Sequence, residues 1–154
     1  MEYGTIEREV HIAASPEVVF DVISRPEHIR DWWSADTEIE PVSGSTSALT
    51  WRDEATGRVD VVPITVIDVQ PHHLFSFRWT HGADETPTTS NSLLVTFELA
   101  PNGDGTVLRM TESGFRERGW EIAQLEEAYH DHVSGWDFYL PRIAEVAVRQ
   151  VSAP

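Results

Sequence analysis

Residues 129–151 read YHDHVSGWDFYLPRIAEVAVRQV, and the spacing of their apolar side chains decides the fold. Apolar residues recur three or four positions apart through the stretch, namely Tyr129, Val133, Trp136, Leu140, Ile143, Ala147 and Val151. This spacing is typical of one face of an α-helix, so it predicts a long terminal helix with one apolar stripe. Pro141 falls inside that helix, where it removes one backbone donor and is expected to bend the helix near Asp137.

A strand and two short helices are predicted at the start of the chain. Residues 7–12 alternate imperfectly between polar and apolar side chains, as in a strand. Ser15, Pro16 and Glu17 then mark a helix start, because serine caps free amides, proline suits the first turn and an acidic side chain favours the positive end. Pro26 interrupts this helix, since the residue before a proline disfavours helical geometry, and a second short helix follows.

The middle of the chain is predicted to form about six further strands separated by turns. Asn102-Gly103-Asp104-Gly105 is the strongest hairpin signal among these turns. Pro63 falls inside one of the strands, which indicates an edge position or a bulge. The six expected strands are residues 37–41, 47–52, 59–69, 74–81, 92–99 and 106–113.

These elements combine into one predicted architecture. An antiparallel sheet of this size has one face to cover, and the final helix is the only element long enough to cover it. We therefore expect a single α+β domain over residues 1–154, in which a curved antiparallel sheet of about seven strands wraps round the long C-terminal helix. Two short helices follow the first strand, and the curved sheet encloses a pocket.

The composition of the chain excludes several classes of function. Its 154 residues carry 26 acidic and 11 basic side chains, a net charge of −15, and all 11 basic residues are arginine. The lack of lysine excludes Schiff-base enzymes and P-loop lysines, and the lack of cysteine excludes thiolate nucleophiles, disulfides and cysteine metal sites. An acidic surface repels nucleic acid and anionic lipid. No segment approaches the roughly 20 apolar residues of a membrane span, so we expect a cytoplasmic protein without membrane insertion or a nucleic-acid partner.

Metal and cofactor motifs are also lacking. His72 and His73 are adjacent, so their side chains diverge. His130 and His132 are two apart on the predicted helix, unlike the i, i+4 pair of a zinc site, and with Asp131 we interpret them as a solvated helix face. The chain contains no G-x-S-x-G elbow, no G-x-G-x-x-G pattern and no P-loop. We expect no metal and no cofactor.

Alternation along the predicted strands selects the side chains that face the terminal helix. One face of each of three strands carries mostly apolar side chains. These faces consist of Phe75, Phe77, Trp79 and His81 on the first strand, Val95, Phe97 and Leu99 on the second, and Leu108, Met110 and Glu112 on the third. These faces form either a packed core or the lining of an open pocket. The candidate ligand-binding residues are Trp33, Phe75, Phe77, Trp79, His81, Phe97, Met110, Glu112, Tyr129, Val133, Trp136 and Leu140.

Polar and aromatic side chains suggest the chemistry of such a pocket. His81 and Glu112 continue apolar faces toward strand ends, where they form either a pair for proton transfer at the cavity mouth or a solvated rim. With Tyr139, they are the candidates for catalytic residues. The six tryptophans suit stacking on an aromatic or polycyclic ligand, although the same residues also serve core packing.

Several stretches of the chain, taken in order, resemble a known superfamily. They are residues 11–20 and 26–33, 66–71 with Leu74, Phe77 and Trp79, 105–108 ahead of 112–115, and 135–136 with 138–140. Their order and spacing resemble those of SRPBCC (START-like, helix-grip) proteins, in the branch similar to the C-terminal domain of the heat-shock-protein-90 ATPase activator. The resemblance implies a helix-grip fold round a ligand cavity. It implies no single activity, because members bind lipids, polyketides, hormones or other hydrophobic molecules and some catalyse cyclisation or hydrolysis.

Three hypotheses of function follow. The first is binding of a small hydrophobic, aromatic or polycyclic molecule between the sheet and the terminal helix. The second is a co-chaperone-like interaction module with a chaperone partner, which the resemblance implies. The third is a small enzyme of the cyclase or hydratase type, similar to polyketide cyclases, that uses His81, Glu112 or Tyr139. Whether the chain is an enzyme stays open, and it is expected to be a monomer or a homodimer.

Overall fold

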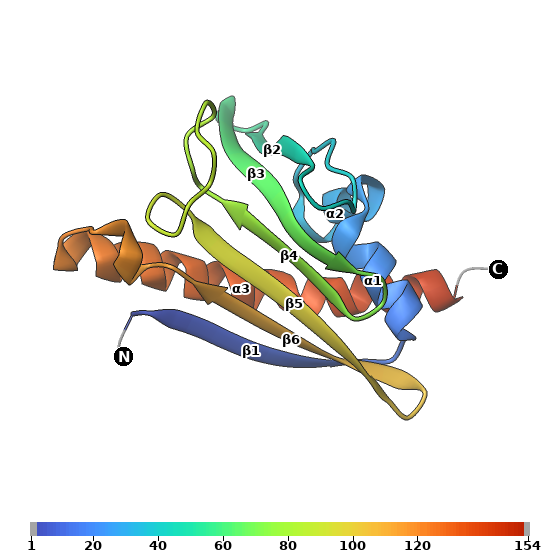
Figure 1. Cartoon of the computed structure of the whole chain (residues 1–154). Coiled ribbons are helices and arrows are strands. Elements are labelled where there is room, and N and C mark those ends of the chain that lie inside the picture. The colour runs from blue at the N-terminus through green and yellow to red at the C-terminus, as the bar shows by residue number, and fades with distance from the viewer. Residues whose placement is uncertain (1–2, 153–154) are drawn as a thin grey trace.

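One antiparallel sheet and a long helix make up most of the structure, a computed structural model that describes residues 3–152 (Figure 1). The strands of this sheet are β1 (Thr5–Ile12), β2 (Thr46–Asp53), β3 (Arg58–Gln70), β4 (Leu74–Trp79), β5 (Leu93–Asn102) and β6 (Gly105–Ser113). Their order across the sheet is β1-β6-β5-β4-β3-β2, and every neighbouring pair is antiparallel. The helices are α1 (Pro16–Ser24), α2 (Pro26–Trp33), the 3-10 turn η1 (Arg116–Arg118) and α3 (Ile122–Ser152).

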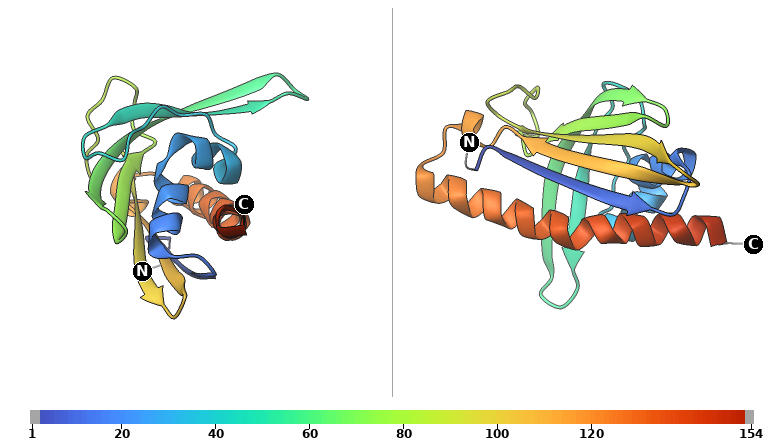
Figure 2. Two further views of the ribbon diagram at one scale, coloured as in Figure 1. Left: turned by 90° about the vertical axis from the view of Figure 1, so that its right-hand side faces the viewer. Right: turned by 90° about the horizontal axis from the view of Figure 1, so that it is seen from below.

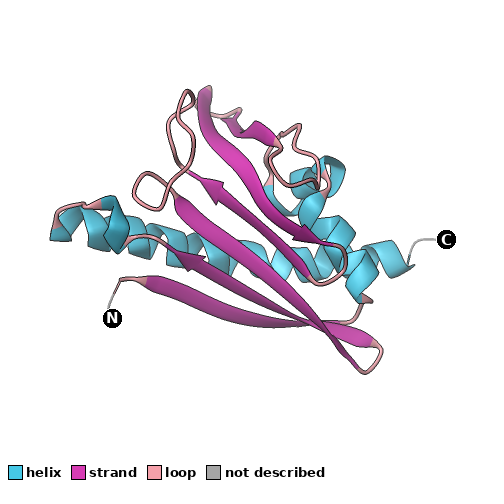
Figure 3. Cartoon of the chain, viewed as in Figure 1, coloured by secondary structure: helices cyan, strands magenta, loops and turns pink. Residues whose placement is uncertain are grey.

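The predicted α+β helix-grip fold is confirmed. The sheet curves round α3, and α1 and α2 follow β1 and pack against α3 at one end of the sheet (Figures 2 and 3). Ser15 caps α1 as predicted, because its Oγ accepts a hydrogen bond of 3.3 Å from the amide of Val18. The hairpin at Asn102–Gly105 is also confirmed, with Gly103 in the left-handed conformation that this turn needs (φ +60°).

The sheet has six strands within the described residues rather than about seven, because residues 37–41 do not form a strand. Serine side chains take the amides that a strand would use for its ladder. The amide of Glu38 donates to Oγ of Ser47 at 3.1 Å, and the amide of Glu40 donates to Oγ of Ser45 at 3.0 Å. Such side-chain bonds compete with regular pairing, so the segment becomes an irregular connection.

Pro63 lies on a stretch of β3 that is paired on one side only. β3 as a whole lies between β2 and β4, but Pro63 pairs only with Ala48 of β2, so it has the locally unpaired edge that the sequence predicts; the bulge of β3 falls elsewhere, between Val66 and Asp68. Pairing with β4 begins only at Ile64, and the carbonyl of Pro63 accepts from the amide of Thr80 at 3.3 Å, just past the end of β4. The donor that proline lacks therefore faces a position where the ladder has already ended.

The terminal helix runs unbroken through Pro141. The predicted stripe is buried at Trp136, Leu140, Ile143 and Ala147. Val151, the last residue of the stripe, is 56% exposed, because the end of α3 extends beyond the strands (Figure 2). No helix in residues 3–152 has the length and apolar character needed to cross a membrane.

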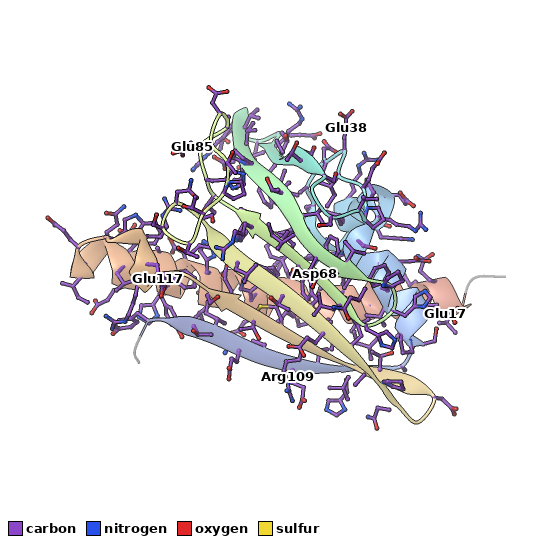
Figure 4. All side chains as sticks on the ribbon, viewed as in Figure 1. Glu17, Glu38, Asp68, Glu85, Arg109 and Glu117 are labelled. Atoms are coloured by element: carbon purple, nitrogen blue, oxygen red, sulfur yellow. The ribbon has the colours of Figure 1, made fainter. Side chains whose placement is uncertain are left out.

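The charged side chains lie on the outside of this fold. Glu17, Glu38, Asp68, Glu85 and Glu117 are all exposed, and Glu38 and Glu85 stand clear of the ribbon in Figure 4. The side chains between the sheet and α3 are almost all apolar or aromatic, and within residues 3–152 a single carboxylate, that of Glu112, is completely buried among them. This carboxylate is the starting point for the candidate site.

Candidate functional site

Glu112 lies on β6 and faces α3, on the same side of the strand as Leu108 and Met110, as alternation predicts. Its side chain is 0% exposed. Oε2 accepts a hydrogen bond of 2.7 Å from the indole Nε1–H of Trp79 on β4. Oε1 accepts one of 2.9 Å from the indole of Trp136 on α3 and lies 2.8 Å from Nδ1 of His132 on the same helix. We call Glu112, Trp79, His132 and Trp136 the carboxylate cluster.

The two indoles of the cluster must donate to Glu112, and the role of His132 follows from the protonation of the carboxylate. An indole can only donate, so neither tryptophan can take a proton from Glu112. An ionised carboxylate accepts all three bonds, with Nδ1–H of His132 as the third donor, and this arrangement leaves every buried polar atom of Glu112 satisfied. A neutral imidazole that carries its proton on Nδ1 has a lone pair on Nε2. Within residues 3–152, Nε2 of His132 has no hydrogen-bond partner.

A cavity of about 170 Å³ adjoins the carboxylate cluster. We call it the tryptophan pocket, and its lining residues are Trp33, Trp51, Trp79, Asp131, His132, Gly135, Trp136 and Tyr139. Trp33 comes from the end of α2, Trp51 from β2 and Trp79 from β4, while the others lie on α3. The pocket therefore lies where the sheet, the second short helix and the terminal helix meet.

Trp33 is the centre of the aromatic lining. Its ring stacks on that of Trp32 at 4.8 Å between centroids with a 9° angle. It also contacts the rings of Trp51, Trp79 and Trp136 at 5.6, 5.1 and 5.5 Å. The indole N–H of Trp51 donates to the carbonyl of Trp33 at 2.8 Å, and those of Trp79 and Trp136 donate to Glu112. Because these three donors are used within the protein, the lining offers aromatic ring surface to a ligand.

Gly135 leaves space in the pocket wall. It lies on α3, and a Cβ built at this position would meet no atom within 4 Å. A larger side chain here would therefore extend into open space beside Trp136 and His132. This position provides a way to fill the pocket without disturbing the core.

His81 occupies a separate buried position. It is 6% exposed, its Nε2 lies 3.2 Å from Oγ1 of Thr65, and its Nδ1 has no partner. Burial lowers the pKa of His81 below its ordinary value, with a smaller opposite effect from Glu85 and a further lowering by Arg118. His81 does not pair with Glu112, and neither residue lies at a solvated rim, so both readings of this pair were wrong.

The structure separates the candidate ligand-binding residues into two groups. Trp33, Trp79 and Trp136 line the tryptophan pocket, and Tyr139 joins them there. Glu112 lies behind the lining and holds it. The other candidates pack in or against the sheet–helix core and are not among the lining residues, namely Phe75, Phe77, His81, Phe97, Met110, Tyr129, Val133 and Leu140.

Sequence reasoning missed His132 and Gly135, and it left Trp51 out of the candidate ligand-binding residues although it counted all six tryptophans as suited to stacking. The interpretation of His132 as part of a solvated helix face is wrong, because its side chain is 22% exposed and bonds to Glu112. The signal was available, since His132 lies three residues after Tyr129 and four before Trp136, on the apolar side of the helix. No group of three or more metal-ligating side chains occurs in the part of the chain that the structure describes.

Comparison with models of protein families shows which family the chain belongs to. The model of the family described as Activator of Hsp90 ATPase homolog 1-like protein matches residues 13–147. The chain belongs to this family. The match begins after β1 and ends within α3, so it includes every residue of the carboxylate cluster. No curated protein matches the chain significantly.

Solved structures of similar fold accompany this family match. Protein MLL2253 from Mesorhizobium loti is 25% identical, with a TM-score of 0.74 over 94% of this chain and 97% of that one. The Aha1 dimer from Colwellia psychrerythraea is 20% identical, with a TM-score of 0.68 over 93% and 95% of the two chains. DynU16, from the dynemicin biosynthetic locus, is 19% identical, with a TM-score of 0.66 over 92% of this chain and 46% of that one. The last two likenesses concern the fold alone.

Proposed function

We propose that this chain binds a small, neutral, single-ring aromatic molecule in the tryptophan pocket. The observation that carries the proposal is a cavity walled by four indoles, three of whose N–H groups bond within the protein. Such a wall can stack on a flat ring and bury its apolar surface. Both effects favour the binding of aromatic ligands. The family match is compatible with ligand binding and specifies no ligand.

The size of the cavity supports a single ring rather than a polycyclic ligand. A cavity of about 150 Å³ in a protein core admits benzene, whereas pockets for drug-sized molecules measure about 300–1,000 Å³. The volume here, about 170 Å³, is close to the first value. A molecule of two or more fused rings exceeds this volume and would extend out of the pocket.

The charge of the lining disfavours an anionic ligand. The eight lining residues include the carboxylate of Asp131 and no arginine, so no cation is present to bind an acid or a phosphate. The net charge of −15 adds a general repulsion for anions.

Filling the pocket at Gly135 tests the proposal. Gly135→Leu places four carbon atoms in the open space on this side of α3, and we expect it to weaken toluene binding at least tenfold by isothermal titration calorimetry. Gly135→Ala is the matched control, because a single methyl group leaves most of the volume free and alanine favours the helix. The proposal fails if the wild-type protein does not bind toluene or other single rings, or if Gly135→Leu binds them as the wild type does.

A chaperone-directed role is the second candidate, and the family match is the observation that favours it. The likeness to the Aha1 dimer supports a dimer or a chaperone partner as the form in which this role would operate. Measuring the ATPase rate of an Hsp90 protein with and without this chain tests the role. A rate that the chain leaves unchanged, over a range of salt concentrations, counts against it.

A further inference from the structure

We infer that the ligand of the tryptophan pocket is a phenol, a single ring whose hydroxyl group donates a hydrogen bond to Nε2 of His132. This inference rests on the proposed function and adds the polar group by which the pocket selects its ligand. It goes beyond ring binding because it assigns a specific acceptor atom and a positioning role to Glu112.

The orientation of the His132 ring is fixed on three sides. Nδ1 is bound to Oε1 of Glu112 at 2.8 Å. The rings of Trp79 and Phe115 meet the imidazole edge to face, at centroid distances of 5.3 and 5.4 Å. A buried carboxylate that holds Nδ1–H keeps the lone pair of an imidazole on Nε2 and aimed in one direction. Glu112 is thus a positioning residue, which acts through His132 and does not line the pocket.

The unpartnered acceptor decides which ring fits the pocket. His132 is one of the lining residues and its side chain is 22% exposed; because Nδ1 is bound to the buried Glu112, Nε2 is the polar atom of this ring that is left to face a ligand. A purely apolar ring would cover this atom and remove its water without replacing the hydrogen bond, which is costly for a polar atom. A ring hydroxyl replaces the water directly. A phenol therefore satisfies both the indole walls and the imidazole.

The other titratable groups around His132 favour a donor that stays neutral. Glu112 faces the imidazole from β6, and Asp131 and Tyr139 line the same pocket from α3. None of these groups is a cation, so a phenolate, a benzoate or a phosphate ester would lack a counter-charge. The hydroxyl group keeps its proton and shares it with Nε2.

Paired titrations of phenol and toluene test the inference. The two molecules have almost the same shape, and toluene is the more hydrophobic, so an apolar cavity without an acceptor prefers toluene. At about pH 8, where an imidazole in water is neutral, we expect the wild type to bind phenol about five- to tenfold more tightly than toluene by calorimetry.

Two variants assign that preference to the acceptor. His132→Phe keeps a flat ring and removes Nε2, so toluene should become the tighter ligand while its own affinity is nearly unchanged. His130→Phe is the matched control, because His130 is exposed two residues earlier on α3 and does not line the pocket; the preference for phenol should persist. Nitrogen-15 NMR of the wild type gives a readout that needs no folded variant, since phenol and not toluene should shift the Nε2 resonance of His132.

Three results separate the inference from the proposed function. If phenol is preferred in the wild type, and both His132→Phe and the Nε2 resonance report it, the inference stands. If toluene binds more tightly than phenol in the wild type, the pocket takes rings and the inference is overturned alone. If neither ligand binds, the proposed function is overturned and the inference falls with it.

Discussion

Replacing Glu112 with glutamine tests the account of the carboxylate cluster most directly. The substitution keeps the shape of the side chain and exchanges one acceptor oxygen for an amide nitrogen. In the wild type both oxygens are used, Oε2 by Trp79 and Oε1 by Trp136 and His132. Either orientation of the glutamine amide therefore places an N–H₂ group against at least one indole N–H.

The magnitude follows from counting the donors that lose an acceptor. In the better orientation the N–H of Trp79 and the amide of the new glutamine are both left unsatisfied, at about 1–3 kcal/mol each. Removing a buried charge offsets part of this cost, because a carboxylate is more expensive to desolvate than an amide. We expect a net loss of about 2–4 kcal/mol, a large share of the 5–15 kcal/mol that typically stabilises a domain.

Urea unfolding followed by far-ultraviolet circular dichroism measures this loss. Glu126→Gln is the control, because Glu126 is exposed on α3 and the same exchange there should change the free energy of unfolding by no more than about 0.5 kcal/mol. If Glu112→Gln unfolds at the same urea concentration as the wild type, the carboxylate does not accept all three hydrogen bonds. A more stable variant would mean that desolvation of the charge outweighs them.

Three further predictions concern the cap, the buried histidine and the core. Ser15→Ala removes the N-cap of α1 and should cost about 1 kcal/mol, seen as a lower thermal midpoint, whereas Ser15→Asp should retain most of the stability. Burial lowers the pKa of His81 below 6.5, so the unfolded chain takes up a proton that the folded chain excludes. The urea midpoint should therefore fall as the pH drops through 6.5 and level off below the pKa of the folded state; an identical profile for His81→Gln would exclude His81 as the cause. Phe97→Ala should cost about 3–5 kcal/mol because Phe97 is fully buried, while Asp137→Asn, which breaks an exposed ion pair with Arg8, should cost less than about 1 kcal/mol; similar values for the two would contradict this ranking.

Most of the fold was accessible from the sequence because its local signals are strong and agree with one another. The stripe from Tyr129 to Ala147 has only one helical interpretation, and the turn at Asn102–Gly105 allows only a hairpin. The segment 37–41 was mispredicted because its pattern is compatible with a strand, and only the neighbouring serines, once folded, decide otherwise. The local edge at Pro63 was predictable because a proline has no amide to donate, whereas the inner place of β3 in the sheet was not.

The candidate site was less accessible because it depends on contacts across elements. Alternation placed Glu112 correctly on the inner face of β6, but nothing local shows which donors meet it there. In the sequence, His132 was considered only as a metal ligand together with His130. Its place beside Trp136 on the apolar side of the helix was therefore overlooked. Its true partner is 20 residues away in sequence, and only the curvature of the sheet brings the two together.

The carboxylate cluster also determines how α3 is aligned along the sheet. A helix with an apolar stripe can slide by one turn, about 5.4 Å, and still bury similar side chains. Such a slide would bring Trp136 and Leu140 to the places of His132 and Trp136, and Glu112 would face a leucine instead of an indole donor. One buried polar residue therefore excludes alignments that the apolar stripe alone would permit, as a single buried polar residue fixes the register of a coiled coil.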